Sequence, residues 1–152
     1  MRQRFTEAMK EALKAGEKRR LSTVRMIQAA LKDKDIEARG AGRGQASEEE
    51  ILALLQKMIK QRQESVAIYD QASRRELADQ EREEIAVIQG FLPRQMDEAE
   101  TRAAVEAAIA ATGAASMKDM GKVIGVLRGK YAGQMDFGKA SALVKSALAG
   151  AG

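Results

Sequence analysis

The only proline of this 152-residue chain, Pro93, divides the sequence into two blocks with helical patterning. Proline ends a helix because it lacks a backbone N–H and pushes the preceding residue out of helical conformations. Asp97, with Glu100 three residues later, then has the pattern of a capping box that begins a new helix. We therefore predict two units, residues 1–93 and 97–149, joined by a short linker.

The composition favours helices in both units. The chain has three phenylalanines, two tyrosines and no tryptophan, while alanine is abundant. Cores built from Leu, Ile, Val, Met and Ala suit helices better than strands. The expected fold is all-α, with an N-terminal domain that contains a hairpin of long helices and a C-terminal domain that resembles a three-helix bundle.

Apolar residues at helical spacing predict four helices in the first unit. Their expected ranges are 2–14 ending at Gly16, 17–38, a long helix that begins at the capping box of Ser47 and Glu50, and 73–90. The expected inward-facing residues are Phe5, Met9, Ala12, Leu13, Leu21, Val24, Ile27, Leu31, Ile36, Ile51, Leu54, Leu55, Met58, Ile59, Val66, Tyr69, Leu77, Ile85 and Ile88. The last two helices should form an antiparallel hairpin, because the turn at 70–73 is short.

Residues 39–46 contain three glycines and predict a loop. A phosphate-binding loop is disfavoured, because such loops follow a strand and a helix precedes this one. A mobile linker is the preferred interpretation.

The second unit should contain three shorter helices. The expected ranges are 97–112 ending at Gly113, 117–130 capped by Ser116, and 137–149 after Gly133 and Asp136. In the middle helix, Gly121, Gly125 and Gly129 are spaced by four residues and share one side. Each interior glycine lowers helix stability by about 1 kcal/mol relative to alanine, so the row predicts that another element or molecule approaches the helix backbone closely. A neighbouring helix is favoured over an RNA backbone or a partner protein.

The residue inventory excludes many enzyme classes. With no cysteine and no histidine, the chain cannot use disulfides, thiol nucleophiles, Cys/His zinc sites or imidazole acid–base chemistry. The candidate carboxylates for acid–base or magnesium chemistry are Glu48, Glu49, Glu50, Glu81, Glu83 and Glu84. Helix capping and solvation explain them better, so we expect no catalytic residue, no metal and no cofactor. No apolar run is long enough to span a bilayer, and the expected location is the cytoplasm.

Positive charge is concentrated at the N-terminal end. Residues 1–46 hold twelve basic and six acidic residues, 47–96 hold seven and ten, and 97–152 hold seven and six. A basic arm indicates an acidic partner such as nucleic acid, although basic helix faces are often only solvated. The basic face predicted for the first unit comprises Arg19, Arg25, Lys60, Arg62 and Arg74.

Motifs spread over nearly the whole chain resemble the GatB/YqeY family, and specifically its short, free-standing YqeY-like proteins. The matching segments are Arg20-Leu21, Val24-Arg25-Met26, Lys60 to Ser65, Arg74 to Leu77 with Glu81 and Glu84, Phe91 to Gln95, Lys118 to Val123, and Gly133 with Asp136. The chain departs from the family pattern where Ser73 replaces a usual glycine, Ile124 a common methionine, and Gln134-Met135 a more usual Arg-Ala.

The resemblance implies a C-terminal unit similar to the helical tail of the GatB subunit of the tRNA-dependent amidotransferase. In that enzyme the tail contacts tRNA, while the catalytic sites lie elsewhere. The implied function is that of an accessory protein that binds tRNA or another structured RNA, without DNA or membrane partners. The RNA-binding residues expected on this basis are Lys118, Lys122, Arg128, Lys130, Lys139 and Lys145. The alternative is a protein–protein adaptor or auxiliary subunit of an amidotransferase, a carbon–nitrogen ligase whose activity resides in the partner.

Overall fold

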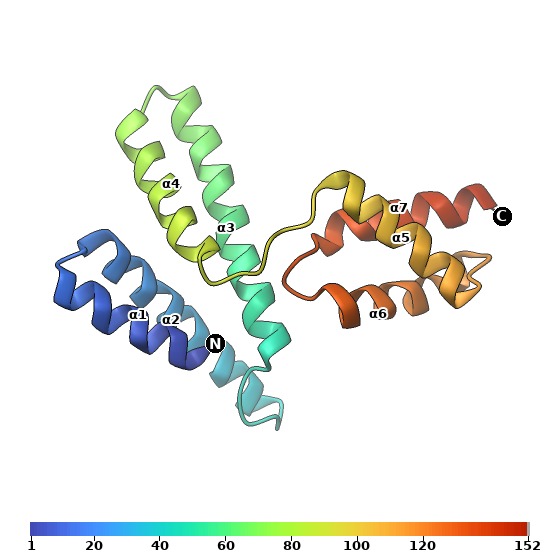
Figure 1. Cartoon of the computed structure of the whole chain (residues 1–152), viewed down its shortest axis with the longest axis horizontal. Coiled ribbons are helices and arrows are strands. Elements are labelled where there is room, and N and C mark those ends of the chain that lie inside the picture. Colours follow the sequence, from blue (N-terminus) through green and yellow to red (C-terminus); the bar gives the residue numbers. More distant parts are fainter. Residues whose placement is uncertain (152) are drawn as a thin grey trace. The chain divides into compact units, whose positions relative to one another are not determined.

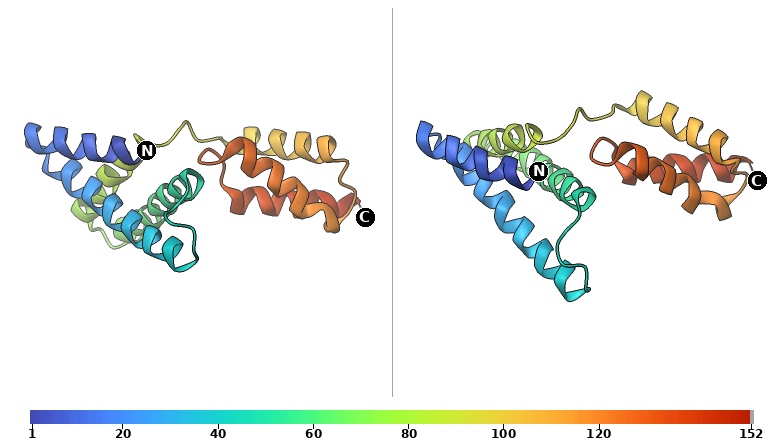
Figure 2. Two further views of the ribbon diagram at one scale, coloured as in Figure 1. Left: turned by 90° about the horizontal axis from the view of Figure 1, so that it is seen from below. Right: turned by 60° about the horizontal axis from the view of Figure 1, so that its bottom comes forward.

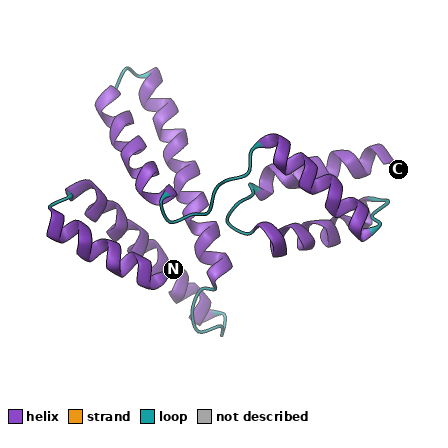
Figure 3. Ribbon diagram, viewed as in Figure 1, coloured by secondary structure: helices purple, strands orange, loops and turns teal. Residues whose placement is uncertain are grey.

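The computed structural model describes residues 1–151 and is helical throughout its regular structure (Figure 1). No strand occurs among these residues (Figure 3), so the all-α prediction is confirmed. The helices are α1 Arg2–Ala15, α2 Lys18–Gly40, α3 Glu48–Gln71, α4 Arg75–Gln89, α5 Glu98–Thr112, the 3₁₀ helix η1 Met117–Asp119, α6 Met120–Tyr131 and α7 Phe137–Ala151. None of the described helices is both long and apolar enough to cross a membrane. The chain divides into two compact units, the first Met1–Pro93 and the second beginning at Arg94.

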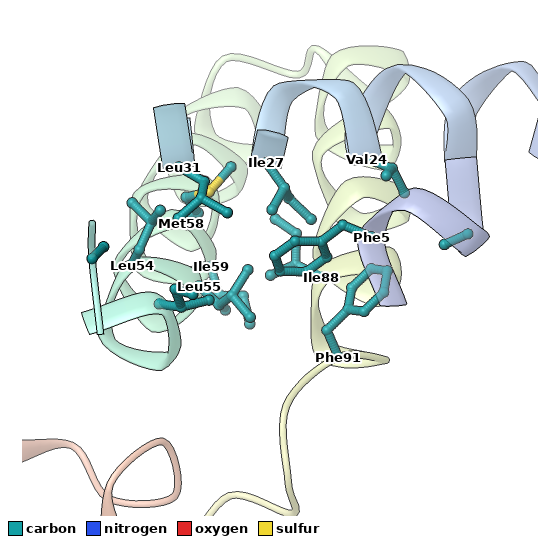
Figure 4. Close-up of a cluster of buried hydrophobic side chains, with 13 residues drawn as sticks. Phe5, Val24, Ile27, Leu31, Leu54, Leu55, Met58, Ile59, Ile88 and Phe91 are labelled. Atoms are coloured by element: carbon teal, nitrogen blue, oxygen red, sulfur yellow. The ribbon is translucent and has the colours of Figure 1, made fainter. Parts of the chain in front are cut away.

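The first unit consists of two helix pairs, α1 with α2 and α3 with α4 (Figure 2). Their apolar sides meet in one core, in which Phe5, Ile27, Leu55 and Ile88 are almost fully buried (Figure 4). The rings of Phe5 and Phe91 meet edge to face, with centroids 4.9 Å apart. Phe91, which follows α4 and precedes Pro93, therefore ties the end of the first unit to α1.

The predicted helix boundaries are confirmed where side chains or glycines define them. Ser47 and Glu50 form both hydrogen bonds of a capping box at the start of α3, and Asp97 with Glu100 does the same for α5. Gly16 and Gly113 end α1 and α5 in the left-handed conformation, at φ 70° and 66°. These are the positions at which glycine is the favoured helix stop.

Three residues expected in the core are exposed: Leu13 by 59%, Ile36 by 56% and Leu77 by 38%. The prediction was wrong for Ile36 because it lies nine residues after the buried Ile27, about 180° around α2. Leu13 follows the buried Ala12 and lies about 100° from it around α1. Leu77 occupies the first turn of α4, next to the turn that connects α3 to α4.

That turn holds Ser73 at φ 58°, the one non-glycine residue with positive φ among residues 1–151. Side chains with a Cβ atom are disfavoured there by about 1 kcal/mol or more. The departure of Ser73 from the glycine expected at this position thus has a structural meaning, because the turn requires a left-handed residue.

The loop after α2, for which a mobile linker was predicted at residues 39–46, is anchored at its C-terminal end. The Ala46 N–H donates to Asp35 Oδ1 over 2.9 Å, and Arg2 donates to the Ala46 carbonyl. Ala46 is itself buried in the core of the first unit. Helix α2 also continues to Gly40, two residues further than predicted.

In the second unit, α5, α6 and α7 pack around their own core, which includes Val105, Leu127, Met135 and Val144. The predicted cap at Ser116 is wrong, since its side chain makes no capping hydrogen bond and a 3₁₀ turn precedes α6. Asp136, by contrast, accepts hydrogen bonds from the N–H groups of the first turn of α7.

Candidate nucleic-acid interface

The basic residues predicted to contact RNA all lie outside the core of the second unit. Each is exposed, and none forms an ion pair with a described acidic side chain. These residues are Lys118, Lys122, Arg128, Lys130, Lys139 and Lys145. The guanidinium of Arg128 lies 5.7 Å from the centroid of the Phe137 ring, which joins α6 to the start of α7.

The glycine row of α6 is open to solvent. A Cβ atom placed on Gly121, Gly125 or Gly129 would meet nothing within 4 Å, so the prediction of a neighbouring helix against this row was wrong. The core contacts of α6 are made by Val123 and Leu127, which lie on the other side of the helix. Sequence spacing identified the row, but it could not tell which side of α6 the core would take.

Two of the predicted cations flank this open row. At about 100° per residue, the three glycines span about 80° of the α6 surface. Lys122 lies about 20° beyond Gly129 on one side of the row, and Arg128 lies about 20° beyond Gly121 on the other. The outer face of α6 is therefore bare backbone between two cationic side chains.

The remaining four cations are less closely grouped. Lys118 lies in η1, so the helical spacing that was expected to align it with Lys122 is interrupted by a 3₁₀ turn. Lys130 lies near the end of α6, about 80° around the helix from Lys122. Lys139 and Lys145 occupy sides of α7 that are about 120° apart.

Charge is segregated within the second unit. Residues 97–112 hold four acidic residues and one basic residue, whereas residues 113–151 hold six basic residues and two acidic ones. Both acids of the basic segment, Asp119 and Asp136, accept hydrogen bonds from backbone N–H groups. The N–H groups of Ala115 and Ser116, together with Lys122, hold the pKa of Asp119 below its usual range. The acids of this segment are thus engaged with the fold.

The basic face predicted for the first unit is only partly available. Arg62 was expected on an exposed face, but its side chain is 14% exposed and pairs with Glu84 over 3.0 Å. Arg19 pairs with Glu83 across helices α2 and α4. The other three residues are exposed: Arg25 on α2, Lys60 on α3 and Arg74 immediately before α4. The prediction left out Arg39, which is exposed and whose spacing from Arg25 is a multiple of seven.

Most of the candidate carboxylates have structural partners. Glu48 lies 3.6 Å from the N-terminal amine, while Glu83 and Glu84 pair with arginines. Burial, and then the nearby carboxylate of Glu84, raise the pKa of Glu81. Among residues 1–151, no group of three or more acidic side chains is placed to hold a metal ion.

The family described as Yqey-like protein matches residues 2–148, which is nearly the whole chain and both units. No curated protein matches the sequence.

Proposed function

The chain belongs to the YqeY-like family, and on that premise we propose that it is a cytoplasmic accessory protein that binds structured RNA, with tRNA as the leading candidate. Binding takes place on the second unit, through the outer face of α6 and the cations near it. The protein supplies contacts to the RNA, and any chemistry on that RNA belongs to another protein.

The observation that carries this proposal is the separation of charge between α5 and the rest of the second unit. All six cations of residues 113–151 are free of ion pairs with described acids, and the two acids there are engaged with backbone N–H groups. Phosphates are the main source of affinity for such a surface, because each neutralised phosphate releases condensed counterions.

The exposed glycines support close approach of a phosphate chain. With no side chain at Gly121, Gly125 or Gly129, an RNA backbone can reach the helix surface while Lys122 and Arg128 contact phosphates on either side. A structured RNA offers such rows of phosphates at fixed positions. The resemblance of the unit to the tRNA-contacting tail of GatB supports tRNA as the candidate.

The experiment is a salt titration of tRNA binding by the full chain and by the double variant Lys118→Ala, Lys122→Ala. Loss of two phosphate contacts should flatten the slope of log affinity against log salt by roughly 1 to 2. The matched control is Lys10→Ala, Lys14→Ala, which removes two exposed lysines of α1 in the first unit. A double variant that binds tRNA like the parent at low salt would contradict the proposal.

A second candidate function is an adaptor or auxiliary subunit that docks on another protein, for example an amidotransferase. It is favoured by Ile68 and Leu77, two apolar side chains exposed by 64% and 38% near the end of the α3–α4 hairpin. Docking through such side chains depends weakly on salt, whereas RNA binding falls steeply with it. Replacing both residues with serine should abolish partner binding if this function holds and leave tRNA binding unchanged.

A further inference from the structure

Four basic residues follow each other at intervals of seven along α2. They are Lys18, Arg25, Lys32 and Arg39, and we call them the α2 stripe. Seven residues make nearly two turns of an α-helix, so successive members are displaced by only about 20° around the axis and about 10.5 Å along it. The stripe therefore runs almost straight over about 31 Å, from the first residue of α2 to its last turn.

The stripe lies away from the core side of α2, and its last two members, Lys32 and Arg39, border a shallow pocket that α2 forms with α1. The side chains of Val24, Ile27 and Leu31 fill the core from the opposite side of the helix. Because α2 is a single uninterrupted helix (Figure 2), the spacing of the four charges is fixed by the backbone. A straight row of charges at fixed spacing fits a stiff, regularly charged partner.

All four side chains are available to such a partner. Each is exposed, and none has a hydrogen bond or ion pair with the described residues, although the charge of Arg39 contributes to lowering the pKa of Asp35. Other basic residues of the same helix are engaged: Arg19 with Glu83, Arg20 with Glu11 and Lys34 with Glu37. The stripe thus contains the four basic residues of α2 whose side chains form no ion pair within the first unit.

We propose that the α2 stripe binds the phosphate backbone of a nucleic-acid duplex. Phosphates of a duplex form long rows of negative charge, and contacts to them need only positive side chains at suitable spacing. Ser22 and Ala29, which lie beside the first three members of the stripe, are small enough to let a broad backbone approach there, whereas Ile36, the next residue in the same seven-residue series, is exposed beside Arg39. The stripe contacts phosphates and not the base edges in the grooves of the duplex, so its binding does not depend on base sequence.

Other partners fit the stripe less well. A helix that lies on a membrane must bury an apolar face in the lipid, and the apolar face of α2 is already buried in the protein core. Binding of single strands depends on aromatic side chains that stack on bases, and α2 contains none. Protein interfaces centre on Trp, Tyr or Arg anchors packed in pockets, whereas the four stripe residues are spread along a convex helix.

This surface is separate from the one proposed on the second unit, and neither proposal requires the other. The test uses the full chain and a fluorescent RNA duplex of 24 base pairs, with binding measured at several salt concentrations. In the test variant all four stripe residues are changed to glutamine: K18Q, R25Q, K32Q and R39Q. The control variant K10Q, K14Q, K57Q, R75Q makes the same change in net charge at exposed basic residues of α1, α3 and α4.

The test variant should lose four phosphate contacts. We expect the salt slope to flatten by about 3 to 4 and the affinity at low salt to fall at least tenfold, while the control changes the slope by less than 1. Circular dichroism of both variants checks that they fold. The milder variant R25Q, K32Q should show about half the change in slope, and it replaces the fourfold variant if that one does not fold.

Equal losses in the test and control variants would indicate an effect of net charge alone and would overturn the inference. No loss in either variant would also overturn it. Stripe-dependent binding to phosphatidylserine vesicles, without binding to the duplex, would also overturn it in favour of a membrane. A DNA duplex of the same sequence is measured in the same way. Whichever of the two duplexes, RNA or DNA, binds more tightly through the stripe is assigned as the source of the phosphates. The variant Lys118→Ala, Lys122→Ala, measured in parallel, reports on the second unit independently.

Discussion

The two units carry the same net charge but use it differently. Residues 1–93 hold eighteen basic and sixteen acidic residues, and residues 94–152 hold eight and six, so each has a net charge of +2. In the first unit, arginines pair with acids on other helices, as in Arg2 with Asp35 and Arg62 with Glu84. In the described part of the second unit, ion pairs occur only around the start of α5, at Arg94 with Glu100 and Arg102 with Glu98.

The number of basic residues in a unit therefore does not locate a binding surface. Pairing decides which cations are available to a partner. In the first unit it removes Arg19 and Arg62 from the predicted face and leaves the α2 stripe. In the second unit it leaves the cations of α6 and α7 free.

The largest expected effect concerns the ion pair between Arg62 and Glu84, which should be essential to the fold of the first unit. Its side chains are only 14% and 8% exposed, and Arg62 also donates to the Met58 carbonyl. Arg62→Ala leaves Glu84 buried without its partner, so we expect a loss of about 3 kcal/mol in the free energy of unfolding, measured in urea. The matched control Arg19→Ala breaks the exposed pair with Glu83 and should cost less than about 1 kcal/mol. Equal losses in the two variants would remove the distinction between buried and exposed pairs.

The next effect concerns the open glycine row of the second unit. Changing Gly121, Gly125 and Gly129 together to alanine should raise the stability of this unit by about 2 kcal/mol, because alanine favours a helix and finds free space there. The same substitution at Gly113, where φ is 66°, should destabilise the unit. Thermal unfolding followed by circular dichroism measures both.

The triple alanine variant also tests the use of the row. If a phosphate chain passes close to α6, tRNA binding should weaken although the unit becomes more stable. Loss of stability in the triple variant would mean that another element packs on the row.

Much of the fold was predictable from the sequence because its signals are local. The capping boxes of Ser47 and Asp97 and the stops at Gly16 and Gly113 depend on residues within one helical turn. The position of Ile36, about 180° around α2 from Ile27, could also have been read from the spacing. The exposure of Leu77 in the first turn of α4 could not, because it depends on tertiary packing.

The candidate site was predictable only in part. The sequence gives the positions of the cations and the spacing of the glycines, but the partners of Arg19 and Arg62 lie 64 and 22 residues away along the chain. Such pairings depend on tertiary structure. The seven-residue interval of the α2 stripe is visible in the sequence, and only the structure separates its members from the paired cations beside them.

A smaller effect is expected at the end of the α3–α4 hairpin, where backbone conformation and not charge limits stability. Ser73→Gly should stabilise the first unit by about 1 kcal/mol, because glycine adopts φ near 58° without steric cost. Ser73→Ala, which keeps a Cβ atom, should give no such gain. Urea unfolding of the three proteins measures the difference, and an equal gain from alanine would show that the serine hydroxyl, and not the backbone, is unfavourable.

The smallest effect appears only in acid and tests whether the charges of the first unit act on its folding. The Arg2 guanidinium, and then the Ala46 N–H, lower the pKa of Asp35 to about 2. Because the pKa in the folded state lies below that of the unfolded chain, near 3.8, the stabilisation is complete above about pH 4 and is lost as the pH falls towards 2. Asp35→Asn should therefore reduce stability at neutral pH and flatten the loss between pH 4 and 2, as measured by the urea midpoint. Arg2→Ala should also reduce stability, and adding it to Asp35→Asn should cost less than it does alone, since the two residues act as a pair. An unchanged acid dependence in Asp35→Asn would mean that this pair contributes nothing to folding, and Arg2 would then belong with the free cations of the molecule.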